Sequence, residues 1–277
     1  MNIAIIVYNK DLAGLNIKSH LDKLDLSKIK NNKINIKIHT IETQHILADN
    51  LDKEIDADLF IFTTTHKSTA NKKTLCVHPI GIYNDDVSLG GKAHSLVPTN
   101  PWLIKNLFLE MKNLKQKFVN EGHTILDEFE VSIEQTHHGP YLEKPALFIE
   151  IGSTEEEWTT KEAGNLIANT LFNVLSVFDP KENTINSANN ACVIGGGHYS
   201  QVGNKLLERT DYCIGHIASK YYIEVLDENL LKQMAEKSNS DLFIFDWKSS
   251  GSGKHRVVEL IEKLGFRWKK SKDLFNN

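Results

Sequence analysis

The stretch Phe129–Trp158, FEVSIEQTHHGPYLEKPALFIEIGSTEEEW, decides the fold. It contains two apolar, β-branched runs separated by a polar segment with two prolines and a glycine. This pattern predicts two neighbouring strands, whose ends would present Thr136, His137, His138, Glu150, Ser153 and Thr154. Adjacent histidines in a continuing strand would face opposite ways. Both can therefore serve one site only if the chain turns, and Gly139-Pro140 supplies that turn.

A second stretch, Ala191–Tyr199 (ACVIGGGHY), has the same design, because an apolar strand runs into three glycines and delivers His198. The GGGH sequence lacks the spacing of a dinucleotide fingerprint and has no P-loop lysine, which excludes both of those sites. Glycine lets the backbone approach a ligand closely. The three glycines, Gly195, Gly196 and Gly197, therefore indicate a catalytic turn that is followed by Tyr199.

Other apolar runs predict the scaffold. Asn2–Tyr8, Asp58–Thr64 and Asp241–Trp247 are typical of strands buried on both faces of a sheet. Asn100-Pro101 predicts the start of a long amphipathic helix, and the spacing of Thr154 and Glu157 predicts a capped second helix. Strands that alternate with helices indicate an α/β fold, which we expect to form a single domain over residues 1–277. The segment 76–91, rich in glycine and proline, is expected to be irregular.

Polar residues that follow a buried strand are where open α/β sheets hold their ligands. His66 and Lys67 come after the apolar run Asp58–Thr64, and His216 ends a short run after Tyr212. The N-terminus of the helix after Thr154 would lie close to Glu150 and Ser153, where backbone N–H groups could hold an anion or a developing oxyanion.

Composition limits the classes of protein. The chain has 277 residues and a formal net charge of −4, which argues against a general nucleic-acid binder. No apolar run approaches the roughly 18 residues of a membrane span, and the N-terminus enters a strand without the basic region of a signal peptide. The three cysteines are far apart, which indicates a reducing compartment and argues against a thiolate zinc site. We therefore expect a cytoplasmic protein.

The charge is unevenly distributed. Between Lys248 and Lys272 there are eight lysines and arginines against two glutamates, a local net charge of +6. This segment is either a solvated C-terminal helix and tail or an edge that contacts phosphates. Lys72 and Lys73 form a smaller candidate patch.

Five histidines stand at the ends of apolar runs: His66, His137, His138, His198 and His216. No spacing among them is a zinc signature such as HExxH. In one possible chemistry, histidines and Glu150 bind zinc, which activates a water for hydrolysis, with His138, His198, His216 and Glu150 as candidate ligands. In the other, a histidine acts as general base while helix-end N–H groups hold the oxyanion. Ser153 and Thr154 are expected to cap a helix rather than attack, so water is the preferred nucleophile.

Three motifs together carry a resemblance: Thr136-His137-His138-Gly139-Pro140, Glu150-Ile151-Gly152-Ser153-Thr154 with Trp158, and Gly195-Gly196-Gly197-His198-Tyr199. In their order and spacing they resemble the D-aminoacyl-tRNA deacylase family of the archaeal and plant type. The likeness extends from Met1 to about Leu264 and includes His66-Lys67-Ser68, Asn100-Pro101 and Gly215-His216.

The resemblance implies hydrolysis of the ester that links a D-amino acid to the 3′ end of tRNA, which keeps D-residues out of translation. It also implies a phosphorylase/hydrolase-like, three-layer α/β/α sandwich with a mixed, mostly parallel sheet, and a zinc-dependent monomer with up to two ions per chain. Neither DNA nor a membrane is an expected partner. The expected catalytic residues are His137, His138, His198, Glu150 and Thr136. The expected substrate-binding residues are Gly139, Gly195, Gly196, Gly197, Tyr199, Ser153, Thr154, His66 and Lys67.

Two other functions stay open. A metallopeptidase or phosphorylase-like hydrolase would need arginines to clamp a phosphate or carboxylate, and the chain has only Arg209, Arg256 and Arg267. A non-catalytic tRNA-binding module would not need histidines at strand ends. A tight pocket lined by the backbone of Gly195–Gly197 and Gly139-Pro140 would suit selection of the D-amino acid.

Overall fold

The computed structural model describes residues 1–26, 29, 33–68, 71–185 and 187–275. Its strands are β1 (Asn2–Tyr8), β2 (Asn35–Ile41), β3 (Leu59–Lys67), β4 (Thr74–His78), β5 (Gly81–Ile82), β6 (Ser95–Leu96), β7 (Glu130–Ile133), β8 (Ala146–Ser153), β9 (Asn190–Ile194), β10 (Cys213–Ala218), β11 (Leu242–Phe245) and β12 (Arg267–Lys270). Its α-helices are α1 (Leu12–Leu21), α2 (Pro101–Asn120), α3 (Glu155–Trp158), α4 (Lys161–Val177), α5 (Glu182–Ile185), α6 (Gln201–Arg209), α7 (Glu228–Lys237) and α8 (Lys254–Lys263).

The larger sheet has the strand order β2-β1-β3-β8-β4-β7. All of its neighbouring pairs are parallel except β8 with β4. The continuous apolar runs of β1 and β3 lie inside this sheet and are buried, as their sequences predict. The predicted α/β class with a mixed, mostly parallel sheet is therefore confirmed.

The two strands of Phe129–Trp158 are not neighbours, which corrects the prediction. β4 lies between them, parallel to β7 and antiparallel to β8. The expectation of irregular chain over residues 76–91 was wrong for its first three residues, which belong to β4, and for Gly81 and Ile82, which form β5. β4 contains only three consecutive apolar residues and is followed by Pro79 and Gly81, so its local pattern is typical of a loop. Pairing with strands on both sides makes it a strand.

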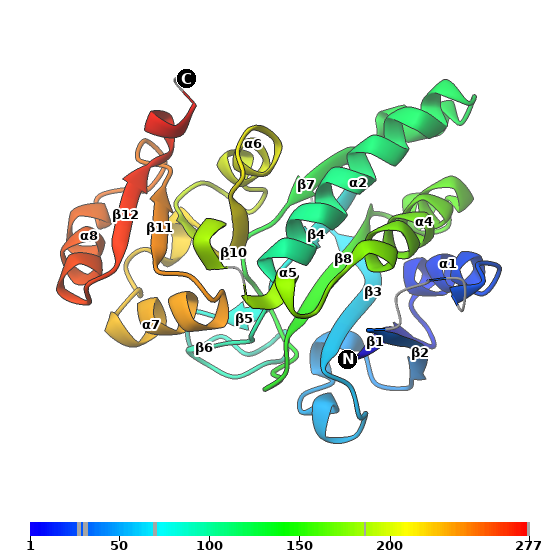
Figure 1. The fold of residues 1–277 in the computed structure, drawn as a ribbon, viewed down its shortest axis with the longest axis horizontal. Coiled ribbons are helices and arrows are strands. Elements are labelled where there is room, and N and C mark those ends of the chain that lie inside the picture. The colour runs from blue at the N-terminus through cyan, green and yellow to red at the C-terminus, as the bar shows by residue number, and fades with distance from the viewer. Residues whose placement is uncertain (27–28, 30–32, 69–70, 186, 276–277) are drawn as a thin grey trace.

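The smaller sheet has the order β10-β9-β11-β12 and is parallel throughout. It lies at the opposite end of the molecule from β1 and β2 (Figure 1). The two sheets meet where the chain continues beyond β7. There Gln135 N donates to His198 O at 2.9 Å, and Thr136 N donates to Ile217 O at 2.9 Å. This seam brings the turn after β9 beside the turn after β7, so both predicted histidine segments reach one place.

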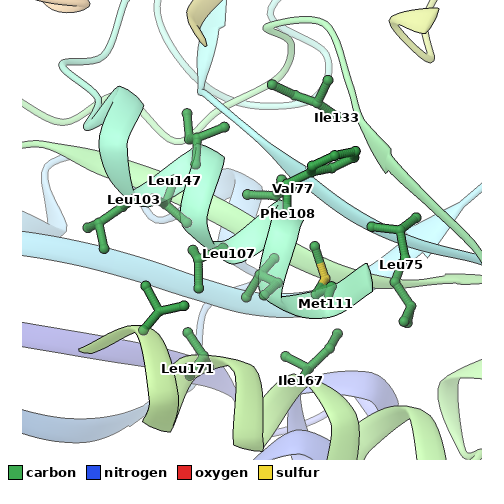
Figure 2. Close-up of a cluster of buried hydrophobic side chains, with 14 of the residues drawn as sticks. Leu75, Val77, Leu103, Leu107, Phe108, Met111, Ile133, Leu147, Ile167 and Leu171 are labelled. Atoms are coloured by element: carbon green, nitrogen blue, oxygen red, sulfur yellow. The ribbon is translucent and has the colours of Figure 1, made fainter. Parts of the chain in front are cut away.

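Helices cover one face of the larger sheet. α1, α2 and α4 pack there, and Leu107, Phe108 and Met111 of α2 are fully buried against β4 and α4 (Figure 2). The predicted start of α2 is confirmed, because the Asn100 side chain accepts a hydrogen bond from Leu103 N at 2.9 Å and Pro101 is the first helical residue. Truncating Leu107 to alanine would cost about 2–5 kcal/mol of folding free energy.

The other layer differs between the two sheets. α7 and α8 pack on the smaller sheet against Phe243 and Phe245. On the larger sheet, Phe60, Phe62 and Phe148 are covered by loop and 3₁₀ residues such as Leu51 instead of by α-helices. This thinner cover leaves room for a cavity on that side. No helix among the described residues is long and apolar enough to cross a membrane.

Candidate functional site

A cavity of about 360 Å³ lies at the seam of the two sheets. The end of β3, the middle of β8, the chain after β7 and the turn after β9 all contribute to its wall. The lining residues are Gln44, His45, Ile46, Thr64, Thr65, His66, Lys67, Leu89, His137, His138, Glu150, Trp158 and His198. Six of the residues expected to act or to bind substrate therefore line one cavity: His66, Lys67, His137, His138, Glu150 and His198.

His66 links a carboxylate to a phenol. Its Nδ1 lies 3.1 Å from Glu150 Oε2, and its Nε2 lies 2.8 Å from the Tyr199 hydroxyl oxygen. Burial alone lowers the pKa of His66, but the hydrogen bond to Glu150 and the charge of Glu134 outweigh it and raise the pKa to about 9. At neutral pH His66 is therefore an imidazolium that donates one N–H to Glu150 and the other to Tyr199.

The sequence analysis expected Glu150 at the end of its strand. It lies instead inside β8, opposite Cys76. Its Oε1 lies 3.4 Å from His78 Nε2. Burial raises the pKa of the Glu150 carboxyl, but the charge of His78 and the hydrogen bond to His66 outweigh burial and hold the pKa below its usual range. Glu150 is therefore an ionised carboxylate held between two histidines.

Glu134, directly after β7, is the most unusual group of the site. It is fully buried, and no donor among the described residues hydrogen-bonds either carboxylate oxygen. His66 Nδ1 lies 3.4 Å from Oε1, and His198 Nε2 and His137 Nε2 lie 3.5 and 3.8 Å from Oε2. Burial raises the pKa of Glu134, but His198 and the charge of His66 outweigh it, so the pKa is lowered and the carboxylate is ionised. A buried carboxylate without donors needs a water or a cation.

The rings of His78, His137 and His138 lie close together, and all three contact the backbone in the same way. The rings of His137 and His138 lie 4.3 Å apart, and those of His78 and His137 lie 4.2 Å apart. In each ring Nδ1 lies within hydrogen-bond distance of a backbone carbonyl, at 3.0 Å for His78 with Pro79 O, 2.8 Å for His137 with Gln135 O and 2.6 Å for His138 with Gly139 O. A carbonyl can only accept, so Nδ1 carries the proton and Nε2 faces the cluster. His138 has a positive φ of 41°, so the predicted turn that serves both histidines is confirmed.

The protonation of these histidines follows from their surroundings. Burial and the neighbouring charge of His78 lower the pKa of His137 well below its usual value and that of His138 to about 4. Both are therefore neutral at pH 7, with a lone pair on Nε2. The pKa of His78 is raised, because Glu150 outweighs the effect of burial. Neutral imidazole is the form of histidine that binds metals.

Four groups of side chains in the described part of the chain could each hold a metal ion. In every group one donor atom of each member lies within 4.8 Å of the others. The groups are His78 with His137 and His138, Glu134 with His137 and His198, His78 with Glu134 and Glu150, and His66 with Cys76 and Glu134. Burial raises the pKa of the Cys76 thiol, which makes the last group the weakest, because only the thiolate is a strong ligand.

His216 and Thr136 lie outside this cluster. His216 Nε2 donates to Val97 O at 3.0 Å, and its Nδ1 lies 3.0 Å from the Thr136 hydroxyl, which itself accepts from Ile217 N at 3.0 Å. Both ring nitrogens of His216 are therefore engaged, and His216 belongs to none of the four groups. The expectations of His216 as a metal ligand and Thr136 as a catalytic residue do not fit this geometry. The two residues join β10 to the chain after β7.

This structural role can be tested. Replacing His216 with alanine is expected to lower the free energy of unfolding by about 3 kcal/mol at pH 7, since a cavity forms and Val97 O loses its donor. Burial outweighs the hydrogen bond to Val97 and lowers the pKa of His216 to about 3, below the ordinary value of 6.5. Between these pH values only the unfolded chain binds the proton, so this contribution to stability is lost as the pH falls.

The deficit of His216→Ala should therefore be smaller at pH 5 than at pH 7 in urea unfolding. The metal bound per chain after dialysis is expected to stay at the wild-type level, whereas His138→Ala should lower it. A lower metal content in His216→Ala than in His138→Ala would return His216 to the ligand set.

Thr154 caps α3, whereas Ser153 ends β8 and does not act as a cap. The Ser153 hydroxyl donates to Lys72 O, and the Glu157 carboxylate accepts from Thr154 N at 2.9 Å and from Ser153 N at 3.3 Å. The expected capping role is confirmed for Thr154 but not for Ser153, whose hydroxyl is bound to Lys72 O instead. The contacts with Glu157 occupy the backbone N–H groups that were expected to hold an oxyanion. α3 is only four residues long, and α4 follows as a separate helix.

The glycine turns differ in what they do. Gly195 and Gly196 have positive φ values of 107° and 81°, but Gly195–Gly197 do not line the cavity. A Cβ on Gly139 would lie 2.3 Å from Gly91 N and 2.5 Å from Ile46 O. The close backbone packing near the cavity is therefore at Gly139, where three loops meet.

Three residues of the site were missed by the sequence analysis: His45, His78 and Glu134. His78 follows a short apolar run, which is the pattern that identified the other histidines, but the run was taken for a loop. Glu134 directly follows the apolar run of β7 within the organising stretch, and its position was the available signal. His45 Nε2 accepts from Tyr8 N at 2.9 Å, and its ring lies edge-on to Phe62, a contact that no local pattern shows.

Known proteins resemble this chain over most of its length. A family model described as D-aminoacyl-tRNA deacylase matches residues 53–269. A D-aminoacyl-tRNA deacylase of Methanocaldococcus jannaschii is 33% identical over 98% of this chain and 100% of its own length. One of Methanosarcina acetivorans is 33% identical over 98% of this chain and 93% of its own length.

A crystal structure titled as a conserved protein of unknown function has the same fold, with a TM-score of 0.82 and 29% identity over 99% of this chain and 96% of that one. The family model covers most of the chain, including the segments that supply the carboxylates and most of the histidines of the cavity. The chain therefore belongs to the D-aminoacyl-tRNA deacylase family.

Proposed function

We propose that this protein hydrolyses the ester bond between a D-amino acid and the 3′ end of tRNA, which releases the amino acid and the tRNA and protects translation. Family membership supports this reaction. The observation that carries it is the buried Glu134 carboxylate, which has no hydrogen-bond donor among the described residues. It lies within 3.8 Å of His66, His137 and His198, and these three histidines line a cavity of about 360 Å³. Such a group can hold the water that attacks the ester.

Water is the attacking group because the available nucleophiles are committed elsewhere. The Ser153 hydroxyl donates to Lys72 O, and the Thr154 hydroxyl donates to Glu157 within the capping box of α3. The thiol of Cys76 is fully buried, and burial raises its pKa. An aminoacyl ester is already reactive, so a positioned water with modest polarisation suffices.

Three side chains have separate roles in the proposed hydrolysis. Glu134 accepts a hydrogen bond from the water and orients it, since an ionised carboxylate can only accept. His198 lies 3.5 Å from Glu134 and is half-buried at the cavity wall, where it can take the proton that the attacking water loses and pass it to the leaving 3′ oxygen. The imidazolium of His66, held by Glu150, contributes a fixed positive charge next to the oxygen on which negative charge develops.

We also propose zinc as a cofactor. Neutral histidines and carboxylates are zinc ligands, and the unpaired Glu134 oxygens together with His78 Nε2, which also lacks a hydrogen bond within the described chain, fit a bound cation. His137 and His138, together with His78 once it has lost its Nε2 proton, would hold it beside Glu134, which leaves His198 free to move a proton. When bound, zinc supplies polarisation of the ester carbonyl and a lower pKa of the attacking water.

The cavity is less suited to the rival hydrolases. No arginine is among the residues that line it. Arg256 donates to the carbonyls of Leu226 and Ile223, and Arg267 pairs with Asp241. A phosphorylase or peptidase that clamps an anion with arginine would find neither of these side chains available.

We further propose that the chain acts as a single-domain monomer in the cytoplasm and has no DNA or membrane partner. The cysteines support a reducing compartment, because Cys76, Cys192 and Cys213 are all free and buried. The net charge of −4 supports a specific tRNA contact rather than general binding to nucleic acids.

The proposal is tested by incubating the purified protein with D-Tyr-tRNA and L-Tyr-tRNA, each with and without a chelator, and measuring ester hydrolysis. Fast loss of the D-ester alone is expected, with activity lost in chelator and restored by zinc. Selective hydrolysis that survives chelation would keep the reaction and remove zinc from it. Hydrolysis of neither ester, or of both at equal rates, would contradict the proposed function.

A further inference from the structure

The basic C-terminal segment divides into two parts in the structure. Lys263 pairs with Glu228 at 2.6 Å and Arg267 pairs with Asp241 at 2.5 Å, so their charges are compensated. Five other lysines of the segment form no ion pair with a carboxylate in the described part of the chain. One of them, Lys269, donates to the Tyr212 hydroxyl at 3.1 Å, and Lys205 of α6 joins the other four. We name these five the lysine patch: Lys205, Lys248, Lys254, Lys270 and Lys272.

Trp247 holds two of these lysines close together. Lys270 Nζ lies 4.3 Å and Lys254 Nζ lies 5.0 Å from the centre of a Trp247 ring. Lys254 Nζ also donates to Trp247 O at 3.0 Å, and Trp268 stacks on Trp247 at 5.8 Å and 16°. Ammonium groups over an aromatic face are partly stabilised without an anion. The two charges are therefore fixed in place but not neutralised.

The other three lysines surround a hollow of about 320 Å³. Lys248 and Lys272 line it from the ends of β11 and β12, and Lys205 lines it from α6. Asp246 is the one carboxylate among its lining residues. Lys248 and Lys272 are exposed, so a partner can reach both.

Hydrogen bonds connect the wall of the hollow to the end of β9, directly before the turn Gly195–Gly197. Asp246 N donates to Ile194 O at 2.9 Å, and the Ser250 hydroxyl donates to the same carbonyl at 3.2 Å, immediately before Gly195–Gly197. Gln201, which also lines the hollow, begins α6 three residues after His198. The hollow that the lysine patch surrounds therefore lies close in the chain to His198, the side chain proposed to act on the ester.

The second basic patch considered in the sequence does not have this character. Lys73 lies close to the carboxylates of Glu128, Glu156 and Glu157, and Lys72 pairs with Glu130. Of the two candidates, only the C-terminal one offers uncompensated positive charge.

We propose that the lysine patch binds the phosphate backbone of the tRNA substrate, next to the 3′ end that enters the cavity. The proposal rests on the function proposed above, which places an aminoacylated 3′ end at His198. An open surface with five separate ammonium groups fits an extended polyanion, whereas a single small phosphate would be held by a convergent site. Lysine contacts to phosphate position the nucleic acid without reading its sequence.

The test uses the double variant Lys248→Gln/Lys272→Gln of the full-length protein. Its matched control is Lys117→Gln/Lys263→Gln, which removes two exposed lysines whose charges are already paired with Glu121 and Glu228. In the patch variant, KM for D-Tyr-tRNA is expected to rise roughly tenfold at 50 mM salt with kcat unchanged. The negative slope of log affinity against log salt should become shallower by about 1.5. The control should change neither quantity.

Two further measurements separate this proposal from the function itself. Fluorescence anisotropy with uncharged tRNA reports binding whether or not the protein hydrolyses the ester, and only the patch variant should bind more weakly. Hydrolysis of D-tyrosyl-adenosine, which lacks the phosphate chain, should proceed at the wild-type rate in both variants. Equal tRNA affinity in the patch variant and the control, or a defect of the patch variant on the adenosine ester, would overturn the proposal.

Discussion

Replacing Glu134 with glutamine is expected to lower kcat for hydrolysis of D-aminoacyl-tRNA by about a thousandfold. The substitution keeps the size of the side chain but replaces one acceptor oxygen with a donor and removes the charge. The amide of glutamine has one acceptor oxygen and no charge. It therefore cannot orient a water through two oxygens or share in holding a cation. Steady-state kinetics with D-Tyr-tRNA measure the effect.

The same substitution should not unfold the protein. Glu134 is an ionised group without hydrogen-bond donors in the described chain, and its burial costs folding free energy. In chelator, the melting temperature of Glu134→Gln is therefore expected to equal or exceed that of the wild type. Opposite effects on activity and stability are typical of groups retained for function.

Glu130→Gln is the matched control, because Glu130 begins β7, the strand that Glu134 directly follows, but is exposed and paired only with Lys72 among the described residues. Its kcat should stay within about twofold of the wild type. If Glu134→Gln kept more than a tenth of the wild-type kcat, Glu134 would be a structural carboxylate and the catalytic assignment would have to move to Glu150.

Gly90→Ala is expected to destabilise the protein by about 4 kcal/mol. A Cβ on Gly90 would lie 1.6 Å from Ile46 O, and φ at this residue is +73°. The clash is with backbone, so one of the two loops must move. Both loops supply the cavity wall through Ile46 and Leu89, so kcat/KM should fall together with stability.

Gly251→Ala separates the two causes. Gly251 has a similar φ of +67°, but nothing lies within 4 Å of its added Cβ, so only the backbone strain remains. Its loss of stability in urea unfolding is expected to be about 1–2 kcal/mol, with activity retained. Equal losses in both variants would show that the loops at Gly90 adjust without cost and that their packing does not define the cavity.

Much of the site could be predicted because its residues follow apolar runs. His66, His137, His138 and His198 each come just after such a run, or at its end, and the structure brings all four to one cavity. A local pattern was enough here, because a buried strand must end at the edge of its sheet.

The residues that were misplaced depend on which face of a strand meets which neighbour. His216 was also expected to end a strand, but β10 continues to Ala218, and the His216 side chain contacts Val97 and Thr136 instead of the cavity. Successive residues of a strand face opposite ways, so the direction of one histidine is set by the pairing of the whole strand. The sequence alone contains no information about that pairing.

By itself, then, the sequence determined the α/β class, the central strands, the helix at Asn100 and the family motifs, because each rests on residues close together in the chain. Only the tertiary structure decided that β4 separates the two strands of Phe129–Trp158, that Glu134 and His78 join the cluster, and that Lys263 and Arg267 are paired while Lys248 and Lys272 are not. The physical reason is common to all of these. Burial, hydrogen-bond satisfaction and charge compensation depend on partners distant in sequence, and a glutamate or lysine has the same local pattern with or without its partner.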